Sequence, residues 1–423
     1  MSNVPNIAVI EIFGYEAVPM LSTIRKQSKD LIVNLDESYF DERMKQMLII
    51  ANSFYNFDSD TAVTITWKNH PLADLMPKQS RIECMPQTQP LPDMTSCEAK
   101  NCIFDRDAGE GIPTCYYPRI SGYKIKQKDH SAMILEKYGT IETPYGKSLK
   151  EISFSTSYLK ESTLNVRIGA PGRFEPPLHF PKESFFTNET FTVKTSNETG
   201  IFSFKVIRVS NNRTIWDTSI GGMMFADQFI QIGAFIGSSQ IYGIGENQQW
   251  RLRHNIMQYT TWPMMARDQP PDSERSRSLI KKNLYGVYPF YLAVENDYKA
   301  HGVLIVNSNP QEITLGPAPH FVYRTIGGML DIYFFPGPSP QDVIRQYLAL
   351  VGHPTVPAYW ALGFQISRYG YKSLSEVKAV VNDMRKAGIP LDVVYADIDY
   401  MDRYQDFTIG KVTLLKLDAK SVN

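Results

Sequence analysis

The sequence of 423 residues has no excess of either charge and no long apolar run. Its 44 Lys and Arg residues balance 44 Asp and Glu residues, so the formal net charge is zero. A neutral chain without a basic block has no electrostatic footprint for nucleic acid, so nucleic-acid binding is not expected. No apolar stretch reaches the roughly 20 residues that a transmembrane helix needs. The N-terminus, MSNVPNIAVIEIFGYEAVP, lacks the basic start and the cleavage site of a signal peptide.

Cysteine is also scarce, and its four residues fall in one short window: Cys84, Cys97, Cys102 and Cys115. A zinc site, free thiols and two disulfides are the competing interpretations. Zinc ligands usually come in closer cysteine pairs than these. The window is rich in proline and glycine, and small turn-rich modules need covalent crosslinks because they cannot build a large core. The pattern therefore favours two disulfides.

Two disulfides would indicate an oxidising compartment, and three N-glycosylation sequons agree with it. The sequons begin at Asn188, Asn197 and Asn212. A lumenal protein without a signal peptide is a contradiction. Its simplest resolution is that the chain is an internal piece, or an alternative product, of a longer secreted or membrane-anchored protein.

The sequence is rich in aromatic residues and in short, partly alternating runs that are typical of β-strands. Aromatics make up 12% of the chain, with 24 Tyr and 22 Phe, which favours β-structure and sugar-stacking surfaces. From about 127 to 338, short and partly alternating runs such as EISFSTSYL and MLDIYFF are separated by turn residues. They predict a β-sandwich. Gly327 and Gly328 stand between two such runs and predict a tight hairpin.

The pattern changes near residue 339. Ser339 and Pro340 predict an N-cap and first helical position, with a helix to about Val351. The run ALGFQIS then indicates a buried strand. Ser373 and Glu376 form a predicted capping box that opens a second helix, and the run VVYADI indicates another strand. The order strand, helix, strand predicts a right-handed parallel unit.

Two acids end the last of these strands. Asp397 and Asp399 are two residues apart, so on a strand they would point to the same side. Acids at the carboxyl end of a parallel barrel strand lie where active sites are built. The alternative is structural: one acid caps the following turn and the other pairs with Arg403.

Residues 240–409 closely resemble glycoside hydrolase family 31, nearest to its intestinal maltase-glucoamylase and sucrase-isomaltase group. The phrases that carry the resemblance include IYGIGE, TWPMMARD, YRTIGGMLDIYFFPGPSP, PAYWALGFQISRYGY and ADIDYMDRYQDFT. The run RIECMPQ…CEAKNCIFD…GIPTCYYP resembles a P-type trefoil module. That resemblance implies the bridges Cys84–Cys102 and Cys97–Cys115. Both halves of the module's third bridge are missing together, because Ile103 occupies one position and no cysteine precedes Cys84.

The resemblance implies a multidomain, mostly β chain with a small disulfide trefoil module, a β-sandwich and only the first two units of a (β/α)8 barrel. Five segments are expected: a C-terminal β-region of a preceding tandem module (1–78), the trefoil (79–126), the N-terminal β-sandwich of the hydrolase module (127–338), the start of the barrel (339–410) and a divergent tail (411–423).

The family's activity is retaining exo-α-glucosidase hydrolysis of terminal α-linked glucose from maltose and short α-glucans. By resemblance, Tyr369 is an aromatic wall of the −1 sugar pocket, Asp397 hydrogen-bonds that sugar, and Ile398 lines the pocket. Arg267 and Asp268 match a sandwich loop that reaches towards the +1 sugar. Without the family, Tyr369 would be interpreted as core and Arg267–Asp268 as a local ion pair. An α-glucan or maltooligosaccharide is the expected partner, on the extracellular or lumenal side of the plasma membrane, with no cofactor and no metal.

The carboxylates that cut the bond are not expected in this chain. In the family, the nucleophile follows the fourth barrel strand in a WIDMNE-like motif and the acid/base follows the sixth. Neither motif occurs in the 423 residues. The chain alone is therefore expected to be inactive. The alternative function is a non-catalytic trefoil and β-sandwich that binds glycans or mucosal glycoproteins.

Overall fold

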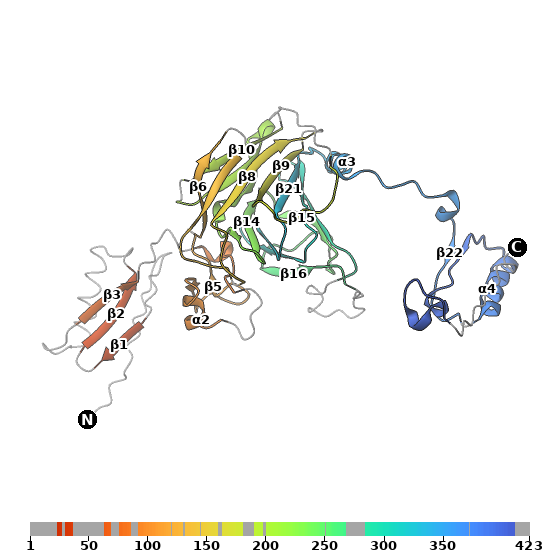
Figure 1. Ribbon diagram of the computed structural model, residues 1–423, viewed down its shortest axis with the longest axis horizontal. Coiled ribbons are helices and arrows are strands. Elements are labelled where there is room, and N and C mark those ends of the chain that lie inside the picture. The colour runs from red at the N-terminus through yellow and green to blue at the C-terminus, as the bar shows by residue number, and fades with distance from the viewer. Residues whose placement is uncertain are drawn as a thin grey trace, which may run out of the picture. The chain divides into compact units, whose positions relative to one another are not determined.

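The computed structural model describes three N-terminal strands and most of residues 76–410. The strands are β1 (Thr23–Gln27), β2 (Asp30–Asp36) and β3 (Val63–Lys68), with β1 antiparallel and β3 parallel to β2. Between 76 and 410 the description leaves out 86–91, 120, 130–131, 144, 160–162, 181–189, 198–199, 250, 268–283 and 372. The chain divides into two compact units, residues 1–351 and 352–423 (Figure 1).

Two eight-stranded sheets form the body of the first unit. The first sheet runs β10-β11-β12-β14-β20-β19-β16, with β13 paired to β14. Its strands are β10 (Phe191–Ser196), β11 (Ser203–Arg208), β12 (Arg213–Asp217), β13 (Met224–Phe225), β14 (Ile230–Ile236), β16 (Thr260–Met264), β19 (Gln311–Gly316) and β20 (His320–Thr325). The second sheet runs β15-β17-β18-β21-β9-β8-β7-β6. Its strands are β6 (Gly122–Lys128), β7 (Ala132–Tyr138), β8 (Glu151–Tyr158), β9 (Leu164–Gly169), β15 (Gln240–Gly245), β17 (Tyr288–Val294), β18 (Ala300–Ile305) and β21 (Leu330–Phe335).

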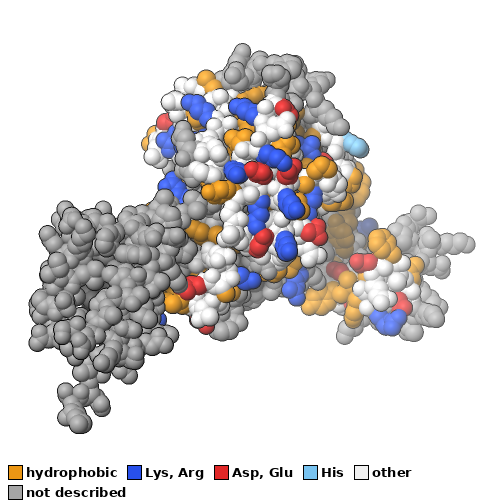
Figure 2. Space-filling view, turned by 60° about the vertical axis from the view of Figure 1, so that its left-hand side comes forward, with side chains coloured by type: hydrophobic (Ala, Val, Ile, Leu, Met, Phe, Trp, Pro, Cys, Tyr) orange, Lys and Arg blue, Asp and Glu red, His pale blue; other side chains and the backbone are white. Residues whose placement is uncertain are grey.

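The two sheets enclose one apolar core, as the alternating sequence pattern predicts. In β8, Ile152 and Phe154 are buried, while Ser153 between them is only half-buried. The core joins side chains of both sheets, among them Trp216 and Phe334, whose rings meet edge to face at 5.6 Å. Burial of such apolar surface stabilises the sandwich by roughly 25 cal/mol per Å². On the face drawn in Figure 2, basic and acidic side chains are interspersed, in keeping with the zero net charge.

The hairpin predicted at Gly327 and Gly328 is wrong. The strand before it, β20, pairs with β14 and β19, whereas the strand after it, β21, pairs with β18 and β9. The glycines therefore carry the chain from one sheet to the other. Gly328 has φ +72°, and the side-chain amide of Asn307 donates to the Gly327 carbonyl at 2.9 Å, which holds the crossing.

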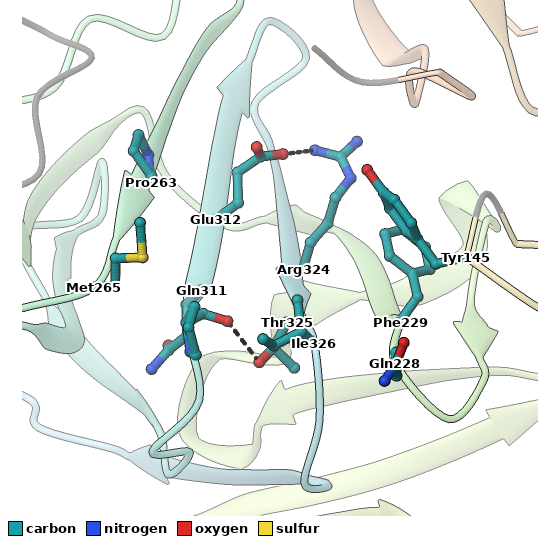
Figure 3. A pocket seen from close by; sticks show the side chains of 11 residues that line it. Tyr145, Gln228, Phe229, Pro263, Met265, Gln311, Glu312, Arg324, Thr325 and Ile326 are labelled. Carbon is teal, nitrogen blue, oxygen red and sulfur yellow. Dashed lines mark hydrogen bonds and ion pairs between the residues drawn. The ribbon is translucent and has the colours of Figure 1, made fainter. Parts of the chain in front are cut away.

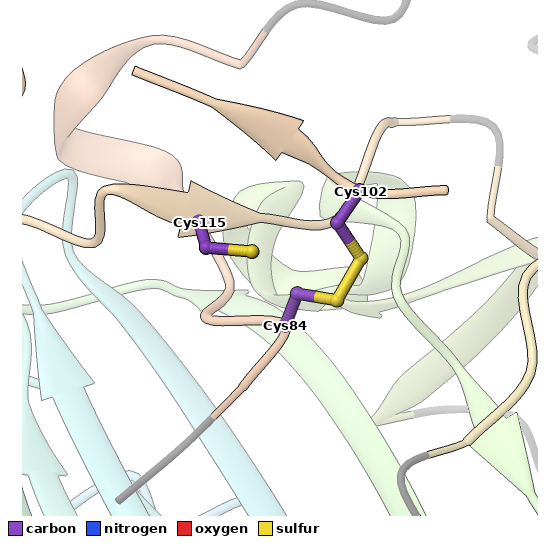
Figure 4. Close-up of side chains that lie close together, drawn as sticks. All are labelled: Cys84, Cys102 and Cys115. Atoms are coloured by element: carbon purple, nitrogen blue, oxygen red, sulfur yellow. A yellow bond between two sulfur atoms is a disulfide. The ribbon is translucent and has the colours of Figure 1, made fainter. Parts of the chain in front are cut away.

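The cysteine module packs against the first sheet. It contains η3 (Lys78–Ser80), α2 (Met94–Glu98), β4 (Ile103–Phe104) and β5 (Cys115–Tyr116). Disulfides join Cys84 to Cys102 and Cys97 to Cys115, which is the pairing that the resemblance implies. Figure 4 shows the Cys115 sulfur beside the first of these bridges, and the sulfurs of Cys84, Cys102 and Cys115 lie within 4.8 Å of one another. All four sulfurs are bonded to a partner, so the zinc and free-thiol interpretations do not apply.

The module and the sandwich share a second apolar cluster. Tyr116 and Tyr117 from the module pack with Phe229 and Val322 from the sandwich. Arg81 is buried there, 2.6 Å from the Asp105 carboxylate and over the Tyr116 ring. The strand β6, which joins the sandwich sheet, begins at Gly122, inside the 79–126 segment assigned to the module. Two further 3₁₀ turns of the first unit are η5 (Val209–Asn211) and η6 (Thr218–Ile220).

Helix α3 (Pro340–Val351) begins and ends where the sequence predicts. The Ser339 hydroxyl accepts the backbone N–H of Asp342 at 3.1 Å, which is the expected N-cap. The helix covers the outer face of the second sheet, where Val343 is fully buried. Gly302 in β18 permits this approach, because a Cβ there would lie 2.6 Å from Val343 Cγ1.

The second unit contains the predicted strand–helix–strand arrangement. It consists of η8 (Tyr359–Leu362), β22 (Gln365–Ile366), α4 (Leu374–Lys386), β23 (Val393–Val394), η9 (Ile398–Tyr400) and η10 (Asp402–Tyr404). β22 and β23 pair in parallel. In α4 the Ser373 hydroxyl accepts the N–H of Glu376, as predicted. The apolar side of α4 is only half-buried within the described residues of this unit.

Candidate functional site

The carboxyl ends of β22 and β23 lie at one edge of their short sheet. Gln365 pairs with Val393 and Ile366 with Val394 in parallel, so the segments that follow the two strands leave in the same direction. The Gly370 N–H donates to Asp399 Oδ2 at 2.7 Å and ties these two segments together. This edge is where parallel α/β folds place ligands.

Asp397 does not lie on a strand. β23 ends at Val394, and Asp397 is the N-cap of η9, where its Oδ1 accepts the Ile398 N–H at 2.7 Å. The expectation that Asp397 and Asp399 extend one strand and share a side is therefore wrong. Three residues separate the two-residue ladder from η9, which begins at Ile398, and each carboxylate accepts from a different backbone N–H.

The structural interpretation of the two acids holds in part. Asp397 does cap the following turn, and it is half-buried. Arg403, however, lies near Asp402, with 3.8 Å between Nε and Oδ1. The expected pairing of Arg403 with Asp399 is wrong, because the Asp399 carboxylate accepts the Gly370 N–H instead. Sequence reasoning missed this tie, because it joins residues 29 positions apart.

Tyr369 is not a core residue. Its side chain is 72% exposed in the described structure of the second unit, whereas Tyr371 is 8% exposed. Arg368 lies over the Tyr371 ring at 5.4 Å and donates from Nε to the Tyr369 carbonyl at 3.1 Å. The Tyr369 backbone is thus held while its ring is left available for contact.

Arg267, predicted to reach the +1 sugar, belongs to the first unit. It follows β16, its side chain is exposed, and its backbone N–H donates to the Leu284 carbonyl at 3.0 Å. Asp268 lies outside the described residues. Ile398, from the second unit, is half-buried next to Asp397.

The strand-end residues of the second unit form an acceptor-rich edge beside an exposed ring. Carboxylates at Asp397 and Asp399 accept hydrogen bonds, and Tyr369 offers an aromatic face. An aromatic ring stacks on the C–H face of a sugar, while a carboxylate takes its hydroxyls. Both carboxylates come from one turn, so they do not face each other across a bound glycosidic bond.

Two of the three predicted glycosylation sites can be described. The side chains of Asn197 and Asn212 are exposed, and Asn212 adopts φ 52° at the end of η5. Asn188 lies outside the described residues. None of the described helices combines the length and the apolarity needed to cross a membrane.

Two family models match the chain. Residues 354–416 match the TIM-barrel domain of glycosyl hydrolases family 31, and residues 74–118 match the trefoil (P-type) domain. The barrel match extends six residues past position 410, the end that the sequence pattern suggested. The trefoil match covers all four cysteines.

Curated relatives extend the similarity over nearly the whole chain. Human intestinal sucrase-isomaltase is 33% identical over 403 residues, 92% of this chain and 21% of the relative. Human probable maltase-glucoamylase 2 is 34% identical over 95% of this chain and 16% of the relative. Lysosomal alpha-glucosidase of Bos taurus is 34% identical over 79% of this chain and 36% of its own length. The chain thus spans about a fifth of the first relative and about a sixth of the second.

Solved structures show the same fold at low identity. The glucosidase II alpha subunit, in a form bound to α3-Glc2, superposes with a TM-score of 0.52 at 18% identity and covers 70% of this chain and 41% of that one. This supports the sandwich and partial barrel as a fold.

Proposed function

Because the chain carries both a segment of the family 31 glycosyl hydrolase barrel and a P-type trefoil domain, we propose that its family activity is α-glucosidase hydrolysis of terminal α-linked glucose. The substrates are maltose and short α-glucans. The observation that carries this proposal is the strand-end edge of the second unit, where the exposed Tyr369 ring accompanies the capping carboxylate of Asp397. The similarity to enzymes named for sucrose, isomaltose and maltose supports the substrate class.

Each site residue has a proposed role. Tyr369 stacks on the −1 glucose, Asp397 accepts hydrogen bonds from its hydroxyls, and Ile398 supplies an apolar wall. Arg267 and Asp268 serve the +1 sugar from the sandwich loop. The exposed Arg267 side chain is compatible with that role, because only its backbone is engaged by Leu284.

These 423 residues recognise sugar but do not hydrolyse it by themselves. A retaining mechanism needs two carboxyl groups about 5–5.5 Å apart that flank the bond as nucleophile and acid/base. Asp397 and Asp399 leave one turn and are each held by a backbone N–H. Two acids fixed on one side of a sugar bind it but do not perform both roles.

The proposed setting is the extracellular or lumenal side of a membrane system. The two disulfides and the exposed sequon asparagines Asn197 and Asn212 suit an oxidising, glycosylating compartment. The proposed segments remain the trefoil, the sandwich and the start of the barrel, with residues 1–78 as a β-region of a preceding module.

Maltose titration of the purified chain by calorimetry tests the site. Asp397→Asn keeps an N-cap side chain but removes the charge, so the turn persists while the hydroxyl contacts weaken. We expect affinity to fall about tenfold, since a hydrogen bond to a charged group is worth roughly 1.5–3 kcal/mol. Asp402→Asn, on the neighbouring turn beside Arg403, is the matched control and should bind like the parent. Equal affinities for all three proteins would refute the proposed role of Asp397.

A further inference from the structure

A hollow of about 460 Å³ opens at one end of the first sheet. It is lined where β14 and β19 begin and where β16 and β20 end. Figure 3 shows Tyr145 and Phe229 on one side, the Glu312–Arg324 pair above, and Met265 across from them. None of these residues is a site residue of the proposed function.

The charges in this hollow are fixed and cancel. Arg324 is 4% exposed and donates to Glu312 at 2.9 Å and to the Thr314 hydroxyl at 3.0 Å. Its Nε donates to Gln231 at 2.7 Å, so the guanidinium is held from three sides. A guanidinium already neutralised by a carboxylate does not select an anion, and the same pair does not select a cation. The electrostatics therefore favour a neutral ligand.

The walls of the hollow are mainly apolar and partly open. Tyr145 is 59% exposed, and its ring lies 5.6 Å from the Phe229 ring, which is buried and fixes it from behind. Met265 is 39% exposed at the opposite wall. An exposed aromatic ring held by a buried one offers a preformed face to the C–H side of a flat ligand.

We propose that this hollow is a second carbohydrate site, which takes one neutral hexose unit. A hexose combines an apolar face for Tyr145 with hydroxyls for the partly exposed Glu312 carboxylate, and it carries no charge that the ion pair would oppose. Resting on the proposed function, the unit is a glucose of an α-glucan. The site is built by the first unit alone, and it needs no residue of the strand-end edge.

Methyl-¹³C methionine NMR of the full chain with maltotriose locates this binding. Met265 lines the hollow and Met401 lies beside the strand-end turn, so their methyl signals, assigned with Met265→Leu and Met401→Leu, report the two sites separately. We expect maltotriose to shift the Met265 methyl signal. Tyr145→Ala should weaken that response by about tenfold, the upper range for an aromatic contact. Tyr145→Phe should keep it.

Controls separate this inference from the proposed function. Tyr138→Ala removes an exposed tyrosine elsewhere on the sandwich and should leave the Met265 response unchanged. Asp397→Asn should weaken the Met401 response only. Any of three results overturns the second site. The Met265 signal does not move with maltotriose, it moves as much in Tyr145→Ala as in the parent, or its movement is lost in Asp397→Asn. A Met401 response untouched by Asp397→Asn overturns the proposed function and leaves the second site standing.

Discussion

At the scale of single residues, the sandwich buries the ion pair of Glu295 and Arg208 together with His301. Glu295 Oε2 lies 2.6 Å from Arg208 Nη1, and its Oε1 lies 2.8 Å from His301 Nδ1, with all three side chains at most 3% exposed. Burial by itself raises the pKa of Glu295, but the hydrogen bonds from His301 and Arg208 outweigh it and hold that pKa below its ordinary value. The carboxylate is therefore charged and compensated at neutral pH.

Removing that charge should destabilise the sandwich strongly. Glu295→Gln leaves the buried Arg208 guanidinium without its counter-charge, and breaking one partner of a buried pair costs about 3–5 kcal/mol. Urea unfolding followed by Trp fluorescence measures the loss. Glu136→Gln breaks the partly exposed pair with Lys124, 3.2 Å long, and should cost under about 1 kcal/mol. Similar losses for the two variants would show that the buried group contributes no special stability.

His320 should make the sandwich sensitive to mild acid. Burial lowers the pKa of His320 to about 4, although its Nδ1 bonds the Pro317 carbonyl. A histidine that stays neutral when folded and takes up a proton when unfolded stabilises the fold above its unfolded pKa of about 6.5. That stability is lost as the pH falls from about 6.5 towards 4. The single group accounts for roughly 2 kcal/mol between pH 7.5 and 5.

The test is a comparison of the parent and His320→Asn at these two pH values. Asparagine keeps a donor for the Pro317 carbonyl but does not titrate. We expect the variant to lose about 2 kcal/mol less unfolding free energy than the parent between pH 7.5 and 5. An unchanged pH dependence would mean that His320 is not the acid-sensitive group.

At this scale the sequence predicts residue types better than their contacts. The four cysteines indicate two disulfides because a small turn-rich window needs them. Asp397 and Asp399 could be singled out, but their partners could not. Those partners depend on how the chain turns after Val394, and a tie such as Asp399 to Gly370 joins residues far apart in sequence.

At the scale of elements, local signals predict helices and fail for strand pairing. Helices α3 and α4 begin at predicted caps because an N-cap is decided by residues three apart. Gly327 and Gly328 correctly indicate a turn. They do not indicate which sheet the next strand joins, since pairing is decided by distant strands. The sandwich itself was predictable from its alternation, whereas its strand order was not.

The cap of α4 should be worth about 1 kcal/mol. Ser373→Ala removes the hydroxyl that accepts the Glu376 N–H, and such a loss typically costs about that much. Ser373→Thr keeps the acceptor and should match the parent. Amide hydrogen exchange in the first turn of α4 measures the difference. Equal protection in Ala and Thr variants would show that the cap does not stabilise this helix.

The Cys97–Cys115 bridge should stabilise the trefoil and its contact with the sandwich. Cys97 and Cys115 are 18 residues apart, and a loop of that size is worth about 3 kcal/mol. In the double variant Cys97→Ala/Cys115→Ala we expect the trefoil to be cleaved by protease before the sandwich. Because Phe229 and Val322 pack on the module, the sandwich should then also unfold at lower urea. A variant as protease-resistant as the parent would contradict this coupling.

At the scale of the whole molecule, trefoil and sandwich share a core, and the barrel segment forms a separate compact unit. The family could be recognised from sequence because its motifs are long and occur in order. The second carbohydrate site could not, since Tyr145, Glu312 and Arg324 come from distant segments that only the sheet brings together. Binding without bond cleavage is the behaviour that we propose for these 423 residues.

The most direct test is glucose release from maltose by the purified 423-residue chain, measured under conditions where calorimetry shows maltose bound. The account predicts binding that depends on Asp397, with no more glucose released than in the Asp397→Asn control. Glucose release that exceeds this control, and that disappears in Asp397→Asn, would contradict it.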